Sequence, residues 1–130
     1  MQDISHLLGP DTVSRVVSDF YDAIQRHPTL SVPFGIVHDW DEHKRHLAHF
    51  WWVTLGGKPY RDQPYRVADK HAAAGFTPAL LVDWLALFRE TLAKHLPEAL
   101  AEQWYARAAN IGRSLEYMHE FRARREALAS

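Results

Sequence analysis

A chain of 130 residues, 47% of them hydrophobic, is enough for one compact domain with a packed core and too short for two independent domains. Fifteen Lys and Arg against sixteen Asp and Glu leave a net charge of −1, so no overall field attracts nucleic acid or an anionic membrane. The lack of cysteine excludes disulfides and thiolate metal sites, and the lack of a signal-peptide pattern and of a long apolar run makes a cytoplasmic protein the expectation.

After a short lead, the first expected helix begins near Pro10, with Asp11 as its N-cap, and ends before Pro28. Its apolar residues recur with helical spacing and form one stripe of Val13, Val16, Val17, Phe20, Tyr21 and Ile24. Tyr21 carries the one polar group of this stripe, and a buried phenol normally finds a hydrogen-bond partner. The pattern predicts an amphipathic helix that turns a tyrosine toward the core.

The stretch from His27 to Asp39 holds two prolines and a glycine, which predicts a loop with at most one helical turn, anchored by Phe34. A second helix is expected from about Asp39 to Leu55, because a glycine pair follows it. One face of this helix carries Trp40, Leu47, Phe50, Trp51 and Thr54.

The same helix holds three histidines in an H-x-x-H-x-x-H pattern. His43 points into the apolar stripe, His46 lies at its edge, and His49 lies nearly opposite. The pattern suggests zinc, but metal-binding histidine pairs on a helix usually stand four residues apart. An interior role for His43 alone is therefore favoured over a zinc site.

A polar stretch with two prolines predicts a connecting loop from Lys58 to Asp69, followed by a short helical segment, Lys70 to Ala74, that carries His71. Thr77 and Pro78 suit the N-cap and the first position of the next helix. That helix has a wide apolar arc of Leu80, Leu81, Trp84, Leu85, Leu87, Phe88, Leu92 and Leu96.

The last expected helix follows Pro97 and continues to about Glu126. Its apolar positions are Leu100, Trp104, Ala108, Ile111, Leu115 and Met118. No segment alternates as a strand does, so the expected fold class is all-α, in a single domain over residues 1–130.

Several polar groups face inward on these expected helices. Tyr21, His43 and Trp84 each place a hydrogen-bonding group on the apolar face of a different helix, and His71 stands apart on its short segment. Each residue alone is ordinary in a core. Together they suggest a pocket.

Five motifs in this order resemble the truncated haemoglobins, and among their groups they are most similar to group III. The match extends from about Val13 to Leu115 and consists of FY at Phe20 and Tyr21, W-x-x-H at Trp40 and His43, FW at Phe50 and Trp51, KH at Lys70 and His71, and WLALF at Trp84 to Phe88. The resemblance implies a globin-like, two-over-two helical sandwich around a non-covalent b-type haem.

The resemblance also implies roles for individual residues. His71 matches the proximal histidine that ligates the iron, and Tyr21, His43 and Trp84 match the distal residues that stabilise a bound ligand. Phe34 matches the phenylalanine that packs on the porphyrin. The other residues implied to contact the haem are Leu47, Phe50, Trp51 and Phe88, with His46, Lys44 and Arg66 as candidates for its propionates.

The function implied by the resemblance is binding of dioxygen and other diatomic ligands at a five-coordinate haem iron, with nitric oxide detoxification or another redox use as an extension. Nitric oxide dioxygenation or peroxidase-like catalysis would need a separate reductase, because the chain has no G-x-G-x-x-G motif. A ligand sensor is one alternative. The alternative from a different class is a haem-free helical binding module in which Tyr21, His43 and Trp84 are satisfied core groups. No nucleic-acid or membrane partner is expected.

Overall fold

The computed structural model describes residues 4–61 and 77–129, and within these ranges the regular structure is entirely helical. The elements in chain order are α1 (Ile4–Leu8), α2 (Pro10–Arg26), the 3-10 turn η1 (Pro33–Ile36), α3 (Trp40–Thr54), α5 (Pro78–His95) and α6 (Glu98–Ala129). The all-α fold class expected from the sequence is therefore confirmed for the described residues.

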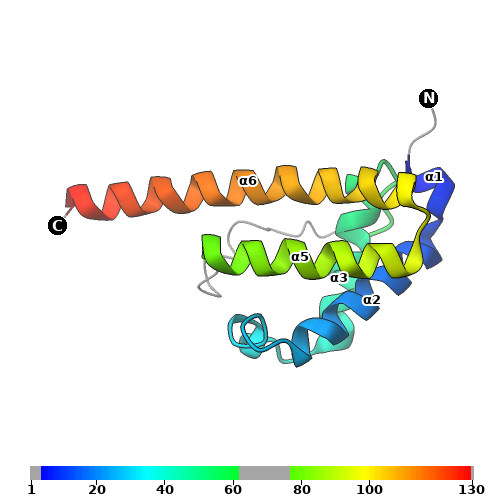
Figure 1. Cartoon of the computed structure of the whole chain (residues 1–130), viewed down its shortest axis with the longest axis horizontal. Coiled ribbons are helices and arrows are strands. Elements are labelled where there is room, and N and C mark those ends of the chain that lie inside the picture. The colour runs from blue at the N-terminus through cyan, green and yellow to red at the C-terminus, as the bar shows by residue number, and fades with distance from the viewer. Residues whose placement is uncertain (1–3, 62–76, 130) are drawn as a thin grey trace.

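The long helices associate as two pairs. Helix α2 packs on α3, and α5 packs on α6, while contacts between α2 and α5 join the two pairs. Figure 1 shows α5 and α6 running in opposite directions along the longest axis of the molecule. The contact between α2 and α5 is the place where the helices bearing Tyr21 and Trp84 meet.

Two of the expected helix starts are confirmed by their capping bonds. The side chain of Asp39 accepts a hydrogen bond from the Glu42 backbone N–H at the start of α3. Thr77 does the same for the Leu80 N–H at the start of α5, with Pro78 in the first turn. These side chains satisfy backbone donors that a helix start leaves without an internal acceptor.

The expected N-cap of α2 was wrong by two residues. Gly9, with φ of +79°, is the N-cap, and Pro10 occupies the first turn, so Asp11 lies inside the helix. Proline suits this position because its fixed φ is already helical and it has no N–H to leave unsatisfied. The expected end before Pro28 is confirmed, because α2 stops at Arg26.

The lead expected before α2 contains helix α1 instead. Ile4 and Ser5 are buried, and the Ser5 N–H donates to the Leu55 carbonyl at 3.2 Å, just past the end of α3. A helix of five residues is too short to show a hydrophobic period, so the sequence pattern could not reveal it.

The core follows the expected stripes closely. All six apolar residues of the α2 stripe are buried, and the fully buried aromatic residues are Phe20, Phe88 and Trp104. Leu47 and Trp51 are the buried members of the predicted α3 face, whereas Trp40 and Phe50 pack against the core while partly exposed. The side chain of Met118 lies outside what the structure describes.

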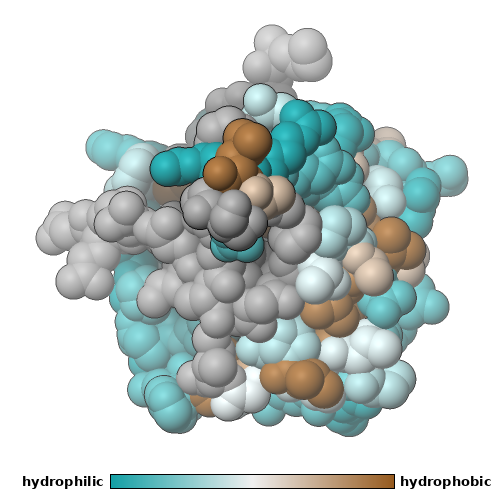
Figure 2. Space-filling model, turned by 90° about the vertical axis from the view of Figure 1, so that its left-hand side faces the viewer, coloured by the Kyte–Doolittle hydropathy of each residue, from teal (hydrophilic) through white to brown (hydrophobic). Residues whose placement is uncertain are grey.

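Helix α6 begins directly after Pro97 and extends past the N-terminal end of α5 (Figure 1). Its first half buries Ala101, Trp104 and Ala108, whereas residues 124–128 are exposed. In the view from the C-terminal end of α6, the described residues are mostly hydrophilic with scattered apolar side chains (Figure 2). None of the described helices combines the length and the hydrophobicity needed to span a membrane.

Candidate functional site

Tyr21 and three aromatic side chains that surround it come from three elements, and we call these four residues the Tyr21 cluster. It consists of Tyr21 on α2, Phe34 on η1, and Trp40 and His43 on α3. The His43 ring stands at 90° to the Tyr21 ring with centroids 5.4 Å apart, and the Trp40 and His43 centroids are 5.5 Å apart. The structure thus brings three of the predicted site residues, Tyr21, Phe34 and His43, into one group.

A second group, the tryptophan cluster, is built from Trp51 on α3, Trp84 and Phe88 on α5, and Trp104 on α6. The Trp51 and Trp84 rings are stacked with centroids 6.5 Å apart, and Phe88 contacts both of them. The ring centroids of Trp104 and Trp51 are 5.9 Å apart. Trp51, Trp84 and Phe88, which were predicted as site residues, therefore lie together in the centre of the core.

Phe20 connects the two clusters. Its ring lies 5.1 Å from that of Tyr21 and 5.0 Å from that of Trp84, edge-on in both cases. The predicted trio of Tyr21, His43 and Trp84 is therefore one continuous aromatic region, in which Trp84 reaches Tyr21 through Phe20. The FY dipeptide of α2 placed Phe20 next to Tyr21 in sequence, but its bridging position depends on how α2 crosses α5.

Two polar links join α5 to α2 and to the segment that follows α2. The Thr29 hydroxyl donates to the Asp83 carboxylate at 2.7 Å, one residue before Trp84. His95 pairs with Asp19 at 2.8 Å, two residues before Tyr21. Both contacts are exposed, so they add little to the buried packing of Phe20 against Trp84.

The indole N–H of Trp84 is buried and has no hydrogen-bond acceptor among the residues that the structure describes. Leaving a buried donor unsatisfied costs about 1–3 kcal/mol, so such groups are rare and call for an explanation. Trp104 has the same property within the described chain, so an unsatisfied indole by itself does not define a ligand site. What distinguishes Trp84 is its connection through Phe20 to Tyr21.

The remaining predicted haem contacts divide into described and undescribed residues. Leu47 is buried on α3, and Phe50 packs partly exposed beside Trp51 with ring centroids 5.2 Å apart. His71, the predicted iron ligand, and Arg66, a predicted propionate partner, lie outside the described residues.

Lys44, another propionate candidate, is engaged by helix α2. Its ammonium lies 2.7 Å from an Asp22 carboxylate oxygen and 3.2 Å from the Ser18 hydroxyl. Asp22 is the residue after Tyr21, and Lys44 is the residue after His43. The ion pair between Lys44 and Asp22 therefore joins α2 to α3 beside the Tyr21 cluster.

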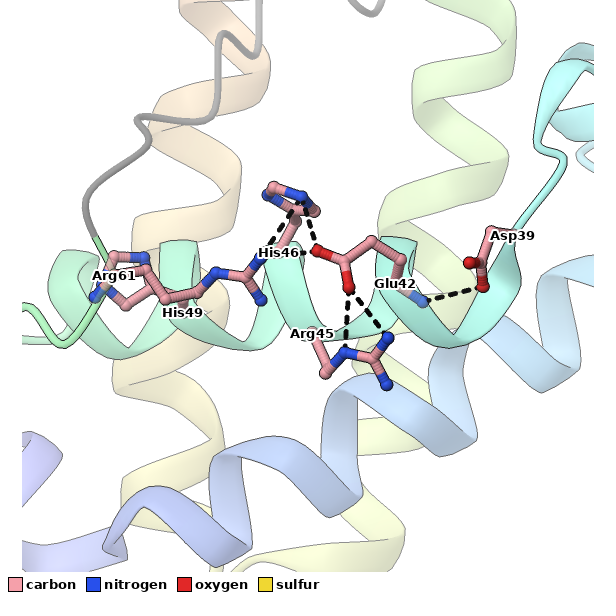
Figure 3. A network of polar contacts seen from close by, with 6 residues as sticks. All are labelled: Asp39, Glu42, Arg45, His46, His49 and Arg61. Carbon is pink, nitrogen blue, oxygen red and sulfur yellow. Dashed lines mark hydrogen bonds and ion pairs between the residues drawn. The ribbon is translucent and has the colours of Figure 1, made fainter.

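The outer face of α3 carries a charged network that the sequence analysis did not anticipate (Figure 3). Glu42 lies at its centre and pairs with Arg45 at 2.8 Å, with His46 at 2.9 Å and with Arg61 at 2.5 Å. The hydrogen bonds from Arg61 and Arg45 lower the pKa of Glu42 to about 2. The spacing of Glu42, Arg45 and His46 was a visible signal for part of it.

The three histidines of the H-x-x-H-x-x-H pattern have three different environments. His43 belongs to the Tyr21 cluster, His46 pairs with Glu42, and His49 accepts hydrogen bonds from backbone N–H groups after the end of α3. Within residues 4–61 and 77–129, no three His, Asp or Glu side chains are grouped to hold a metal ion.

No protein-family model matches the chain, and no curated protein matches it either. The functional conclusion therefore depends on the residues and contacts described above.

Proposed function

We propose that this chain is a haem protein of the truncated globin type, which binds dioxygen or another diatomic ligand beside Tyr21, His43 and Trp84. The observation that carries the proposal is the buried indole N–H of Trp84, which lacks an acceptor among the described residues and lies one aromatic ring from Tyr21. The resemblance of the five sequence motifs to group III truncated haemoglobins supports it. The two helix pairs and their aromatic interior are compatible with it.

A bound diatomic ligand would supply what the Trp84 N–H lacks. An indole is a hydrogen-bond donor only, and a terminal oxygen atom of a bound ligand is an acceptor. The surrounding rings of Phe20, Trp51 and Phe88 exclude water, and a hydrogen bond is electrostatically stronger in such a low-dielectric setting. In the proposed site Trp84 donates to the ligand from α5, and Tyr21 and His43 approach it from α2 and α3.

The residues proposed to hold the haem come from sequence and structure together. His71 is the proposed iron ligand on the strength of the sequence resemblance. Phe34, Leu47 and Phe50 are the proposed apolar contacts, and His46 is kept as a propionate candidate although it also pairs with Glu42. Haem iron supplies reversible coordination of dioxygen when it is bound.

Redox use of the bound ligand is the enzymatic extension of this proposal. Conversion of nitric oxide and dioxygen to nitrate consumes one electron per turnover. The chain contains no G-x-G-x-x-G motif, so we propose that a separate reductase delivers that electron.

The first test is haem binding by the whole chain. Titration with haemin should give a saturable Soret band at an equimolar ratio, and His71→Gly should lose the normal five-coordinate ferrous spectrum. A chain that takes up no haemin would refute the proposal, and a His71→Gly variant with an unchanged ferrous spectrum would refute the ligand assignment.

The second test separates the two unsatisfied indoles. Trp84→Phe keeps an aromatic ring but removes the donor, so dioxygen should dissociate about tenfold faster, the factor that corresponds to about 1.4 kcal/mol. Trp104→Phe is the matched control, because it removes an equally buried N–H whose ring contacts are Trp51 and Phe88. Equal dissociation rates in the two variants would contradict the role of Trp84.

His43→Leu distinguishes the haem protein from a haem-free helical module. In the proposed function, this variant should change the rates of dioxygen or cyanide binding. In a haem-free module, it would be tolerated or stabilising and leave no change in the visible spectrum.

A further inference from the structure

The four residues after the glycine pair at the end of α3, residues 58–61, lie back along that helix, and we call them the strap. The Trp52 indole N–H donates to the Lys58 carbonyl at 2.9 Å. Farther along, the backbone N–H groups of Tyr60 and Arg61 both donate to Nε2 of His49, at 3.1 and 3.2 Å. The strap is therefore held by side chains of α3 through its backbone.

His49 can hold the strap only in its neutral form. Nε2 accepts a hydrogen bond through its lone pair, so the ring proton must be on Nδ1 in this arrangement. Protonation places a hydrogen on Nε2, and this atom then faces two backbone N–H groups as a third donor. Both hydrogen bonds to the strap are lost in that state.

The charges around His49 come from α3 and from the strap itself. Among the described residues, the titratable groups that face it are His46 and, through it, Glu42 on α3, and Arg61 and Tyr60 on the strap. The Tyr60 ring centroid lies 4.6 Å from that of His49. Burial lowers the pKa of His49 below its ordinary value of 6.5, and the positive charges of Arg61 and His46 lower it further. Acidification is therefore the change that protonates His49.

We propose that residues 58–61 form an acid-released strap on α3, in which proton uptake by His49 frees the backbone of Tyr60 and Arg61. The inference uses no part of the haem assignment. Opening of the strap takes up one proton in the pH range between the pKa of His49 in the closed and in the open state. The equilibrium constant for opening therefore rises by up to about tenfold for each unit that the pH falls through this range.

A second anchor limits how far the strap moves. The Arg61 guanidinium pairs with Glu42, as Figure 3 shows, and this pair does not depend on His49. Because the pKa of Glu42 is about 2, its carboxylate stays charged while His49 titrates. Release thus frees the backbone N–H groups of Tyr60 and Arg61 while the Arg61 side chain stays tethered to Glu42.

The test is amide hydrogen exchange of the whole chain by NMR between about pH 5 and 8, with rates corrected for the intrinsic pH dependence of exchange. The amides of Tyr60 and Arg61 should be protected at the upper end, and should lose protection by up to about tenfold per pH unit as the pH falls from the open-state pKa of His49 toward its closed-state pKa. The Trp52 indole N–H signal reports whether the Lys58 end of the strap moves as well.

Three variants isolate the role of His49. His49→Gln places a non-titrating oxygen acceptor near the position of Nε2, so protection should persist across the whole range. His49→Phe keeps a ring without an acceptor, so protection should be low at every pH. His46→Gln is the control, because it removes the neighbouring titrating group and should leave the pH dependence in place.

Two results would overturn the proposal. One is protection of the Tyr60 and Arg61 amides in His49→Phe that equals protection in the unaltered chain. The other is a pH dependence that survives in His49→Gln. If the strap releases as described while the chain takes up no haemin, only the proposed function fails.

Discussion

Gly57 lies against the face of an indole, and this contact predicts a large effect from a one-carbon substitution. A Cβ atom at position 57 would stand well inside 3.0 Å of Cε2, Cδ2 and Nε1 of Trp52. Real Cβ contacts do not occur at such distances. In Gly57→Ala the indole must therefore move away, and it takes with it the Nε1 donor that bonds the Lys58 carbonyl.

The magnitude follows from two contributions. Displacing the partly buried Trp52 ring costs about 1–3 kcal/mol on the scale of overpacking, and loss of its hydrogen bond costs about 0.5–1.5 kcal/mol more. Gly57→Ala should thus lower the free energy of unfolding by about 1.5–4.5 kcal/mol. Gly35→Ala is the matched control, because a Cβ atom there meets nothing within 4 Å, and its effect should be within about 0.5 kcal/mol.

Urea unfolding of a double-mutant cycle measures the contact directly. In a Trp52→Ala background the added methyl meets no ring, so the penalty of Gly57→Ala should largely disappear. A penalty of the same size in both backgrounds would show that the cost does not come from Trp52. A penalty below about 0.5 kcal/mol in the unaltered background would refute the geometry of the turn.

Other substitutions test the caps, the core and the charged network. Asp39→Ala removes the acceptor for the Glu42 N–H and should cost about 1 kcal/mol in urea unfolding, whereas Asp39→Asn should cost much less. Phe88→Ala empties a fully buried site between Trp51 and Trp84 and should cost about 3–5 kcal/mol, whereas Leu128→Ala, at a side chain 88% exposed, should change stability by less than about 0.5 kcal/mol. The lowered pKa of Glu42 predicts a contribution to stability that is present above its ordinary pKa of 4.5 and is lost as the pH falls toward 2. In Glu42→Gln, the melting temperature should therefore fall less between pH 4.5 and pH 2 than it does in the unaltered chain. An equal fall in both proteins would contradict this.

Local chemistry explains which parts of the fold could be predicted from sequence. The cap at Thr77, the start of α3 near Asp39, the stop before Pro28 and the buried stripe of α2 depend on neighbours within a few positions, and the structure has them as expected. Periodicity also predicts that Tyr21 and His43 face inward, whereas their contact with each other and with Phe34 depends on how α2 crosses α3.

Contacts between distant residues could not be predicted in the same way. The partner of Glu42 across nineteen positions is Arg61, and it is visible only once the chain has turned back after Gly57. The partner of Lys44 is Asp22, which depends on where α2 crosses α3. The bridging role of Phe20 likewise depends on the crossing of α2 and α5, which periodicity does not specify.

Helix α6 extends beyond the hydrophobic core, so part of its helix content does not report on the folding of the core. Residues 124–128 are helical but exposed, so backbone hydrogen bonds and intrinsic propensity maintain this end, whereas Trp104 is anchored in the core. Isolated helical turns are marginal in water and melt gradually with temperature. Far-UV ellipticity should therefore decline before the aromatic near-UV signal, and a midpoint taken from helix content would understate the temperature at which the core unfolds.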